Sequence, residues 1–177
     1  MKPTYNKSLD LARIISEVLH NGQRYGDGED YTVHLQTVYE VLIEFNCEWE
    51  HVKIASYLHD VPEDTQCSLK LIKKYFGEDV EHVVYLVTNE QGKDRKERNS
   101  KTYQKLANQE DGVMLKLADR IANTRHSRKQ GGKFFEMYAQ EFAIFKYFLY
   151  NEAHCEVVQN MWKELERISK PIESCLF

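Results

Sequence analysis

Apolar residues that recur at helical spacing constrain the fold of this 177-residue chain more than any other feature. Leu11, Ile15 and Leu19 fall on one face of a helix, and comparable apolar stripes follow along most of the chain. The chain contains only three prolines and eight glycines, which disfavours the many turns of an all-β fold. The sequence therefore predicts an all-α helical bundle.

Local signals predict where some of these helices begin and end. Ser68 is expected to cap a helix that stops at Gly77, and the valine-rich stretch 80–87 fits a helix although β-branched residues also favour strands. The polar segments 24–30, 89–100 and 127–133 are predicted to be loops. We find no linker, repeat or low-complexity tract, and residues 1–177 are expected to form a single domain.

Charge and composition restrict the classes of partner. The net charge of −4 provides no overall basic surface for a nucleic acid or an anionic membrane. No stretch approaches 18 apolar residues, so no membrane span is expected. The four cysteines form no CxxC pair, which favours reduced thiols and a cytoplasmic location over a cysteine zinc site. A small-molecule partner is expected, and association into a homo-oligomer is left open.

One short segment concentrates ionisable side chains. The sequence YLHDVPEDT places His59, Asp60, Glu63 and Asp64 within six positions. Pro62 cannot continue a helix comfortably, so the preceding helix is expected to end near Asp60 and to leave the next two acids on a short turn. Such crowding is costly unless solvent, ion pairs or a metal ion organises it.

Two further residues complete a candidate metal-binding set. His34 begins the second expected helix, and Asp119 lies one step from a buried stripe, where an unpaired carboxylate is expensive. Two imidazoles and two carboxylates suit Mn²⁺, Mg²⁺, Fe²⁺ or Zn²⁺ in a site without thiolates. Taken singly, His34 is more simply a hydrogen-bonded core residue and Asp119 an ion-pair partner of a neighbouring arginine, so the residues alone leave both interpretations open.

Three motifs, taken together and in order, resemble the HD-domain metal-dependent phosphohydrolases. They are HNGQRYGDGEDYTVHL, LHDVPEDT followed by SLKLIKKYFGEDVEHVVYLVT, and LKLADRIANTR. Within that superfamily they are most similar to the RelA/SpoT-type (p)ppGpp hydrolases, and above all to the small single-domain, metazoan SpoT homologue-like type. The resemblance covers about residues 9–125. It implies a single HD-domain helical bundle.

The resemblance also implies roles for individual residues. It implies a divalent metal ion, with Mn²⁺ as the expected one, and four ligands: His34, His59, Asp60 and Asp119. Glu63 and Asp64 match the pair that the family uses for water activation and substrate handling. No serine or cysteine nucleophile motif is present, which fits hydrolysis without a covalent intermediate.

The expected substrate contacts come from both the resemblance and the charge pattern. By resemblance, Arg24 faces the nucleobase or a phosphate, Asn123 contacts the ribose or base, and Tyr138 packs on the nucleoside. The cation-rich run KDRKERNSKTYQK supplies Arg98 and Lys101 as expected phosphate contacts. Runs of this kind are more often solvated helix faces.

The implied activity is hydrolysis of the 3′-pyrophosphate of a guanosine or adenosine alarmone such as ppGpp. Three features depart from the family pattern: Leu35 replaces a proline, Tyr25 replaces a basic residue, and the sequence diverges from His126 onward. Tyr25 leaves room for another HD-type nucleotide phosphohydrolase, either a nucleotidase or a 2′/3′-phosphatase of a nucleotide cofactor. A non-catalytic regulatory module is a third alternative, against which retention of the whole ligand set argues.

Overall fold

The computed structural model describes residues 7–26 and 28–170, and helices dominate this part of the chain. The predicted all-α class is confirmed. The helices are α1 Lys7–Leu19, α2 Tyr31–Glu44, α3 Glu50–Leu58, α4 Val61–Asp64, α5 Leu69–Phe76, α6 Glu78–Val87, α7 Arg95–Leu106, α8 Glu110–Gln130, α9 Lys133–Leu149 and α10 Glu156–Ser169. A small antiparallel hairpin joins β1 (Arg24–Tyr25) to β2 (Glu29–Asp30).

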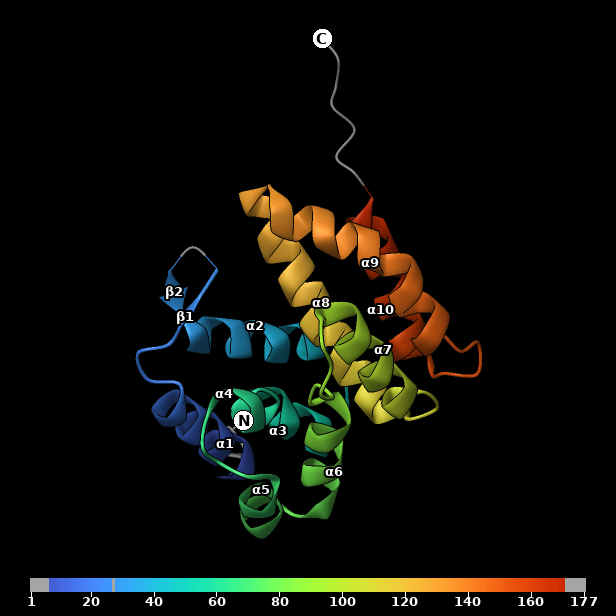
Figure 1. Cartoon of the computed structure of the whole chain (residues 1–177). Helices are drawn as coiled ribbons and strands as arrows, with labels where there is room; N and C mark the ends of the chain where they lie inside the picture. Colours follow the sequence, from blue (N-terminus) through green and yellow to red (C-terminus); the bar gives the residue numbers. More distant parts are fainter. Residues whose placement is uncertain (1–6, 27, 171–177) are drawn as a thin grey trace, which may run out of the picture.

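Helix α8 runs through the middle of the molecule, and the other helices are arranged around it (Figure 1). It packs most extensively against α2 and α10, and it also contacts α3, α6, α7 and α9. Val113, Leu117 and Ile121 of α8 are fully buried. Gly112 allows this close packing, because a Cβ atom there would lie 2.7 Å from the side chain of Leu106. Burial on several sides holds α8 rigidly in place.

The helix boundaries predicted around residue 77 are confirmed. Helix α5 begins directly after Ser68, and the chain turns at Gly77 with a φ of +93° that glycine adopts without strain. The valine-rich stretch that follows is a helix, α6, because Val80, Val83, Val84 and Val87 all pack into the core. Tertiary burial therefore outweighs the strand preference of these residues.

Three segments predicted as loops contain regular structure. The 24–30 segment forms the hairpin, whose two-residue strands are too short to show an alternating pattern. Helix α7 begins at Arg95, within the predicted 89–100 loop, because the carboxylate of Asp94 caps it by accepting a hydrogen bond of 2.8 Å from the Glu97 N–H. Helix α8 continues to Gln130, and Arg128 near its end donates to the backbone carbonyl oxygen of Ile168 at 2.6 Å.

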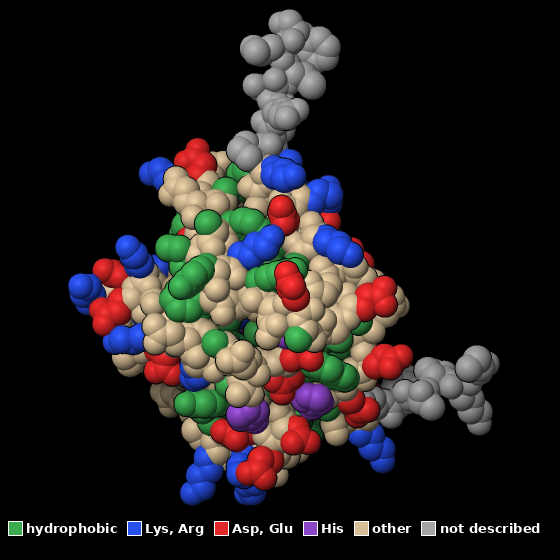
Figure 2. Space-filling model, turned by 90° about the vertical axis from the view of Figure 1, so that its right-hand side faces the viewer, with side chains coloured by type: hydrophobic (Ala, Val, Ile, Leu, Met, Phe, Trp, Pro, Cys, Tyr) green, Lys and Arg blue, Asp and Glu red, His purple; other side chains and the backbone are tan. Residues whose placement is uncertain are grey.

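The surface carries mixed charge. On the face that Figure 2 shows, basic and acidic side chains are interspersed. Within residues 7–26 and 28–170, no helix combines the length and the apolar character that crossing a membrane requires.

Candidate active site

The chain breaks between α3 and α4 at the segment that concentrates ionisable residues. Helix α3 ends at Leu58, and α4 begins at Val61 with Pro62 in its first turn, where its missing N–H costs nothing. His59 and Asp60 therefore occupy the junction, while Glu63 and Asp64 lie on a new helical turn beside it. The predicted break is present, and the predicted turn is a short helix.

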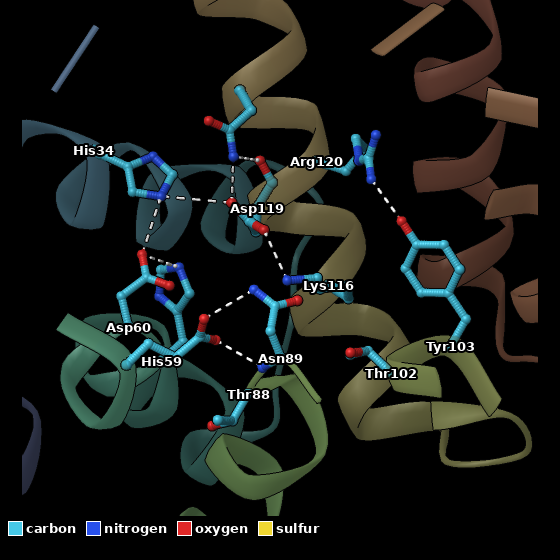
Figure 3. Close-up of polar contacts among 12 residues, drawn as sticks. His34, His59, Asp60, Thr88, Asn89, Thr102, Tyr103, Lys116, Asp119 and Arg120 are labelled. Carbon is cyan, nitrogen blue, oxygen red and sulfur yellow. Dashed lines mark hydrogen bonds and ion pairs between the residues drawn. The ribbon is translucent and has the colours of Figure 1, made fainter. Parts of the chain in front are cut away.

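His59 and Asp60 meet His34 from α2 and Asp119 from α8 (Figure 3). The His34 Nε2 atom lies 3.5 Å from Asp119 Oδ1 and 3.7 Å from Asp60 Oδ2. The His59 Nε2 atom lies 3.0 Å from Asp60 Oδ2. Ligand atoms of His34, His59 and Asp119 all lie within 4.8 Å of one another, so these three can share one ion. Asp60 lies against both histidines and can complete the set.

The buried histidine atoms fit a metal ion. The Nδ1 atom of His59 lies 2.8 Å from the Ser56 carbonyl oxygen, which can only accept, so this nitrogen carries the proton. In the neutral form of His59, which is the form that binds a metal ion, Nε2 is therefore the unprotonated nitrogen; it is buried, lies 3.0 Å from Asp60 Oδ2 and has no hydrogen-bond partner among the described residues. An orphaned imidazole nitrogen beside two carboxylates is what a divalent cation requires.

The electrostatic environment also favours a positive charge at this place. Burial lowers the pKa of His59, but the carboxylates of Asp60 and Asp119 outweigh burial and raise that pKa to about 9. Burial raises the pKa of Asp60, yet the neighbouring histidines lower it overall. The Tyr31 hydroxyl donates to Asp60 Oδ2 at 2.6 Å and holds this carboxylate in place. The cluster therefore stabilises both its own anions and an added cation.

Glu63 and Asp64 differ in how the chain holds them. Both carboxylate oxygens of Glu63 accept hydrogen bonds of 2.8 Å from Asn89, one from its backbone N–H and one from its side chain. Asp64 is held through its backbone carbonyl oxygen, which accepts from the Gln23 side chain at 3.0 Å. Burial and the nearby Asp60 raise the pKa of the Asp64 carboxyl. Asn89 thus fixes the orientation of the Glu63 carboxylate, whereas the Asp64 carboxyl is protonated more readily than an ordinary aspartate.

Cationic side chains line the same cavity of about 250 Å³ as the acidic cluster. Lys116 lies 3.3 Å from Asp119 Oδ2, and Arg95 and Arg120 both bind Glu141 of α9. Arg120 also donates to the Tyr103 hydroxyl at 2.8 Å (Figure 3). The cavity therefore places a candidate cation site next to groups that attract phosphate oxygens.

The structure brings some of the expected substrate contacts together. Arg24, Asn123 and Tyr138 line a neighbouring cavity of about 220 Å³, and the last two also line the acidic cavity. Arg98 and Lys101 lie elsewhere, since neither lines either cavity. Lys101 instead pairs with Glu97 at 2.7 Å on the exposed side of α7, as expected for a solvated helix face.

The sequence places Lys116 and Arg120 in a basic run over 116–133 that could surround a metal centre, and both line the acidic cavity. Sequence reasoning gave no specific role to two other residues that line this cavity, Asn89 and Arg95. Asn89 carries no local signal, because its partner Glu63 is 26 residues away in sequence. Arg95 belongs to the cation-rich run, from which Arg98 and Lys101 were selected instead.

Comparisons with known proteins agree with this geometry. The sequence model of a family described as "HD domain" matches residues 12–148. The guanosine-3′,5′-bis(diphosphate) 3′-pyrophosphohydrolase of Aquifex aeolicus is 33% identical over 127 residues, which are 70% of this chain and 18% of that protein. The Drosophila melanogaster enzyme of that name, MESH1, is 34% identical over 110 residues, covering 60% of this chain and 62% of its own length.

A solved structure shares the fold over nearly the whole chain. It is described as a metazoan ortholog of SpoT that hydrolyzes ppGpp, and it matches with a TM-score of 0.75 and 25% identity over 92% of this chain and 96% of its own. The chain spans less than a fifth of the length of the first curated relatives, such as the Aquifex enzyme at 18%. These matches confirm the resemblance predicted from the three motifs.

Proposed function

The chain belongs to the HD domain family, and on that premise we propose that it is a metal-dependent alarmone hydrolase. The reaction removes the 3′-pyrophosphate of a guanosine or adenosine alarmone such as ppGpp, releasing pyrophosphate and the nucleoside 5′-diphosphate. One observation carries the proposal: a single cavity is lined by His34, Asp60 and Asp119 and by three cations, Arg95, Lys116 and Arg120. The names of the Aquifex and Drosophila relatives support the same substrate class.

The metal ligands in this proposal are His34, His59, Asp60 and Asp119, and the ion is Mn²⁺. A divalent ion supplies Lewis-acid chemistry, because it makes water more acidic near neutral pH and offsets the charge of the phosphoryl group. The mixed nitrogen and oxygen donor set supports Mn²⁺ over a thiolate-bound metal.

Glu63 and Asp64 have separate roles in the hydrolysis: one orients the attacking water, and the other protonates the leaving group. Asn89 binds both carboxylate oxygens of Glu63 and fixes their orientation, so Glu63 suits the alignment of the attacking water. Asp64 has a raised pKa, so it suits delivery of a proton to the departing nucleoside oxygen. Both residues line the cavity that contains the metal cluster.

The cations hold the pyrophosphate, and the neighbouring cavity holds the nucleoside. Arg95 and Arg120 share the single carboxylate of Glu141, which leaves this group with a surplus positive charge facing the cavity. The smaller cavity offers the ring of Tyr138 and the guanidinium of Arg24 to a nucleoside. We assign no phosphate contact to Arg98 or Lys101.

The proposal includes a single domain over residues 1–177 and activity in the cytoplasm. Packing of α10 on α8, the helix that carries Asp119, supports one shared core. Thiols at Cys47, Cys67 and Cys155 are free, which fits a reducing compartment.

Product analysis tests this function directly. Purified protein with Mn²⁺ is given ppGpp, pppGpp, ppApp, 5′-mononucleotides and NADPH, and the products are separated by chromatography. We expect pyrophosphate from at least one alarmone and from none of the other compounds. Orthophosphate from mononucleotides or NADPH, without pyrophosphate from any alarmone, would instead establish the second candidate, a nucleotidase or cofactor phosphatase, which Tyr25 at the edge of the cavity favours.

A double variant provides the control. Glu63→Ala with Asp64→Ala is expected to abolish turnover and to bind Mn²⁺ like the wild type, because neither residue belongs to the proposed ligand set. Persistent turnover in this variant would refute the assigned proton chemistry.

A further inference from the structure

Tyr25 lies where three cavities meet. Its side chain lines the acidic cavity, the neighbouring nucleoside cavity, and a third cavity of about 470 Å³ between α2 and α8. One face of its ring stacks on His34, with 4.7 Å between ring centroids and 20° between planes. His126 lies 4.7 Å away in a tilted arrangement. Tyr25 thus contacts the candidate metal ligand His34 and also lines the cavity proposed for the nucleoside.

The hairpin reaches this position because of a glycine. Gly26 has a φ of +55°, and a Cβ atom there would lie 2.3 Å from the Nε2 atom of His126. Glycine adopts this positive φ without strain, and a larger residue would also force the His126 ring to move. The chain therefore brings the Tyr25 hydroxyl within reach of residues on α8.

That hydroxyl connects to a candidate metal ligand through one side chain. The Tyr25 hydroxyl donates to Asn123 Oδ1 at 2.7 Å. The Asn123 amide nitrogen in turn donates to the Asp119 side-chain Oδ1 and, at 3.0 Å, to the Asp119 backbone carbonyl oxygen. Because the amide nitrogen must face the carboxylate, the amide oxygen faces Tyr25. Burial raises the pKa of the Tyr25 hydroxyl, which therefore keeps the proton that it donates.

We propose that Tyr25 is a positioning residue for the metal centre, acting on Asp119 through Asn123 and on His34 through its ring. Hydrogen-bond partners of metal ligands orient those ligands and raise metal affinity. Both of these hydrogen bonds from the Asn123 amide nitrogen go to Asp119, so this amide orients the proposed ligand. The inference rests on the proposed function only in requiring that the cluster binds a divalent ion.

Metal binding without substrate tests the inference. The dissociation constant for Mn²⁺ is measured by calorimetry on metal-free protein at fixed pH. Tyr25→Phe keeps the ring on His34 and removes the hydroxyl, and we expect its dissociation constant to rise about 10- to 100-fold. Tyr57→Phe is the matched control: this hydroxyl also donates at 2.7 Å to a side-chain amide oxygen, that of Gln36, and it lies outside the acidic cavity. The control should bind Mn²⁺ like the wild type.

A double-mutant cycle tests the route through the amide. If Tyr25 acts on Asp119 through Asn123, adding Tyr25→Phe to Asn123→Ala should change the Mn²⁺ dissociation constant by less than about 2-fold. Fully additive losses would overturn the relay. Should Tyr25→Phe fold poorly by circular dichroism, Asn123→Ala is tested alone, and wild-type Mn²⁺ affinity in that variant overturns the relay equally.

The two levels of the proposal fail in different ways. Wild-type affinity in Tyr25→Phe overturns the positioning of Asp119 through Asn123 and leaves the proposed function intact. A wild-type protein that binds no Mn²⁺ overturns the metal centre itself, and the positioning role falls with it.

Discussion

Two charged clusters face the same cavity, and they differ in how completely the chain satisfies its own buried groups. The cluster around Asp60 and Asp119 contains a buried imidazole nitrogen, His59 Nε2, without a hydrogen-bond partner among the described residues. In the cluster around Glu141, both carboxylate oxygens accept hydrogen bonds, from Arg95, Asn99 and Arg120. The first cluster needs a cation from outside, whereas the second is held by its own side chains.

This difference assigns metal binding to the cluster around Asp60 and Asp119, and a structural role to the cluster around Glu141. A cluster with a buried ligand atom that no hydrogen bond satisfies should change in stability when a metal ion is added or removed. A cluster with internal pairs should contribute the same stability whether or not a metal ion is present, because its partners belong to the chain. Four predictions test this contrast, beginning with the largest expected effect.

Removal of metal ions is expected to lower turnover by about 10³-fold or more, because several kcal/mol of charge stabilisation is lost. Turnover should return when Mn²⁺ is added to the chelated protein. Mn²⁺ at 100 times its dissociation constant should also raise the free energy of unfolding by about 2.7 kcal/mol. His59→Ala should abolish that stabilisation, and full activity in protein shown by mass spectrometry to be metal-free would contradict the first half of the contrast.

Replacement of Arg120 by Met should lower the free energy of unfolding by about 3–5 kcal/mol, because Glu141 loses its most buried partner. The loss should be equal with and without Mn²⁺, as measured by urea unfolding. Arg95→Met is the matched control: its side chain is 44% exposed, against 7% for Arg120, and both bind Glu141. Its loss should stay within about 1 kcal/mol. Equal losses of unfolding free energy in the two variants would show that burial does not make the Arg120–Glu141 pair more stabilising than the Arg95–Glu141 pair.

Asn89 and Asn99 both line the cavity, and each donates a side-chain hydrogen bond to one glutamate. Asn89→Ala should lower kcat about 10- to 100-fold. Glu63 would lose the side-chain hydrogen bond that orients its carboxylate toward the attacking water. Asn99→Ala should lower kcat less than about 3-fold, because Glu141 keeps both arginines. Steady-state kinetics of the two variants provide the comparison. A larger loss of kcat in Asn99→Ala than in Asn89→Ala would contradict the structural role given to the Glu141 cluster.

Acid should weaken the Glu141 cluster with a defined sign. Burial raises the pKa of Glu141, but the two arginines lower it overall, so the folded state binds a proton less readily than the unfolded state. The stability from this group is present above the unfolded pKa of about 4.3 and is lost as the pH falls toward the folded value. Thermal unfolding between about pH 5 and pH 3 should therefore show a smaller loss in Glu141→Gln than in the wild type. If stability falls with pH equally in the wild type and in Glu141→Gln, the ion pairs of Glu141 do not contribute to the loss of stability in acid.

Much of the fold follows from local patterning. Val80, Val83, Val84 and Val87 mark a helix because burial of one stripe outweighs β-branched preference. The hairpin at 24–30 was missed, because two-residue strands leave no periodicity to detect. The start of α7 was missed because the polar sequence around Asp94 fits both a loop and a capped helix.

The candidate site divides in the same way. His34, His59, Asp60 and Asp119 could be selected from motifs, and the structure brings them together. The Asn89–Glu63 and Tyr25–Asn123 contacts join residues 26 and 98 positions apart, so no local pattern reports them. They depend on how helices pack, which is a property of the folded chain.

Helix α8 also sets the distances between residues of the candidate site. Lys116, Asp119, Arg120 and Asn123 lie on two successive turns of it, so a rise of about 1.5 Å per residue fixes the spacing between the candidate metal ligand Asp119, the cations beside it and its partner Asn123. An insertion of one residue would rotate everything beyond it by about 100° and would misplace the core together with the site. Substitutions in the hairpin or in the first turns of α9 would leave this spacing unchanged, because both segments lie outside α8.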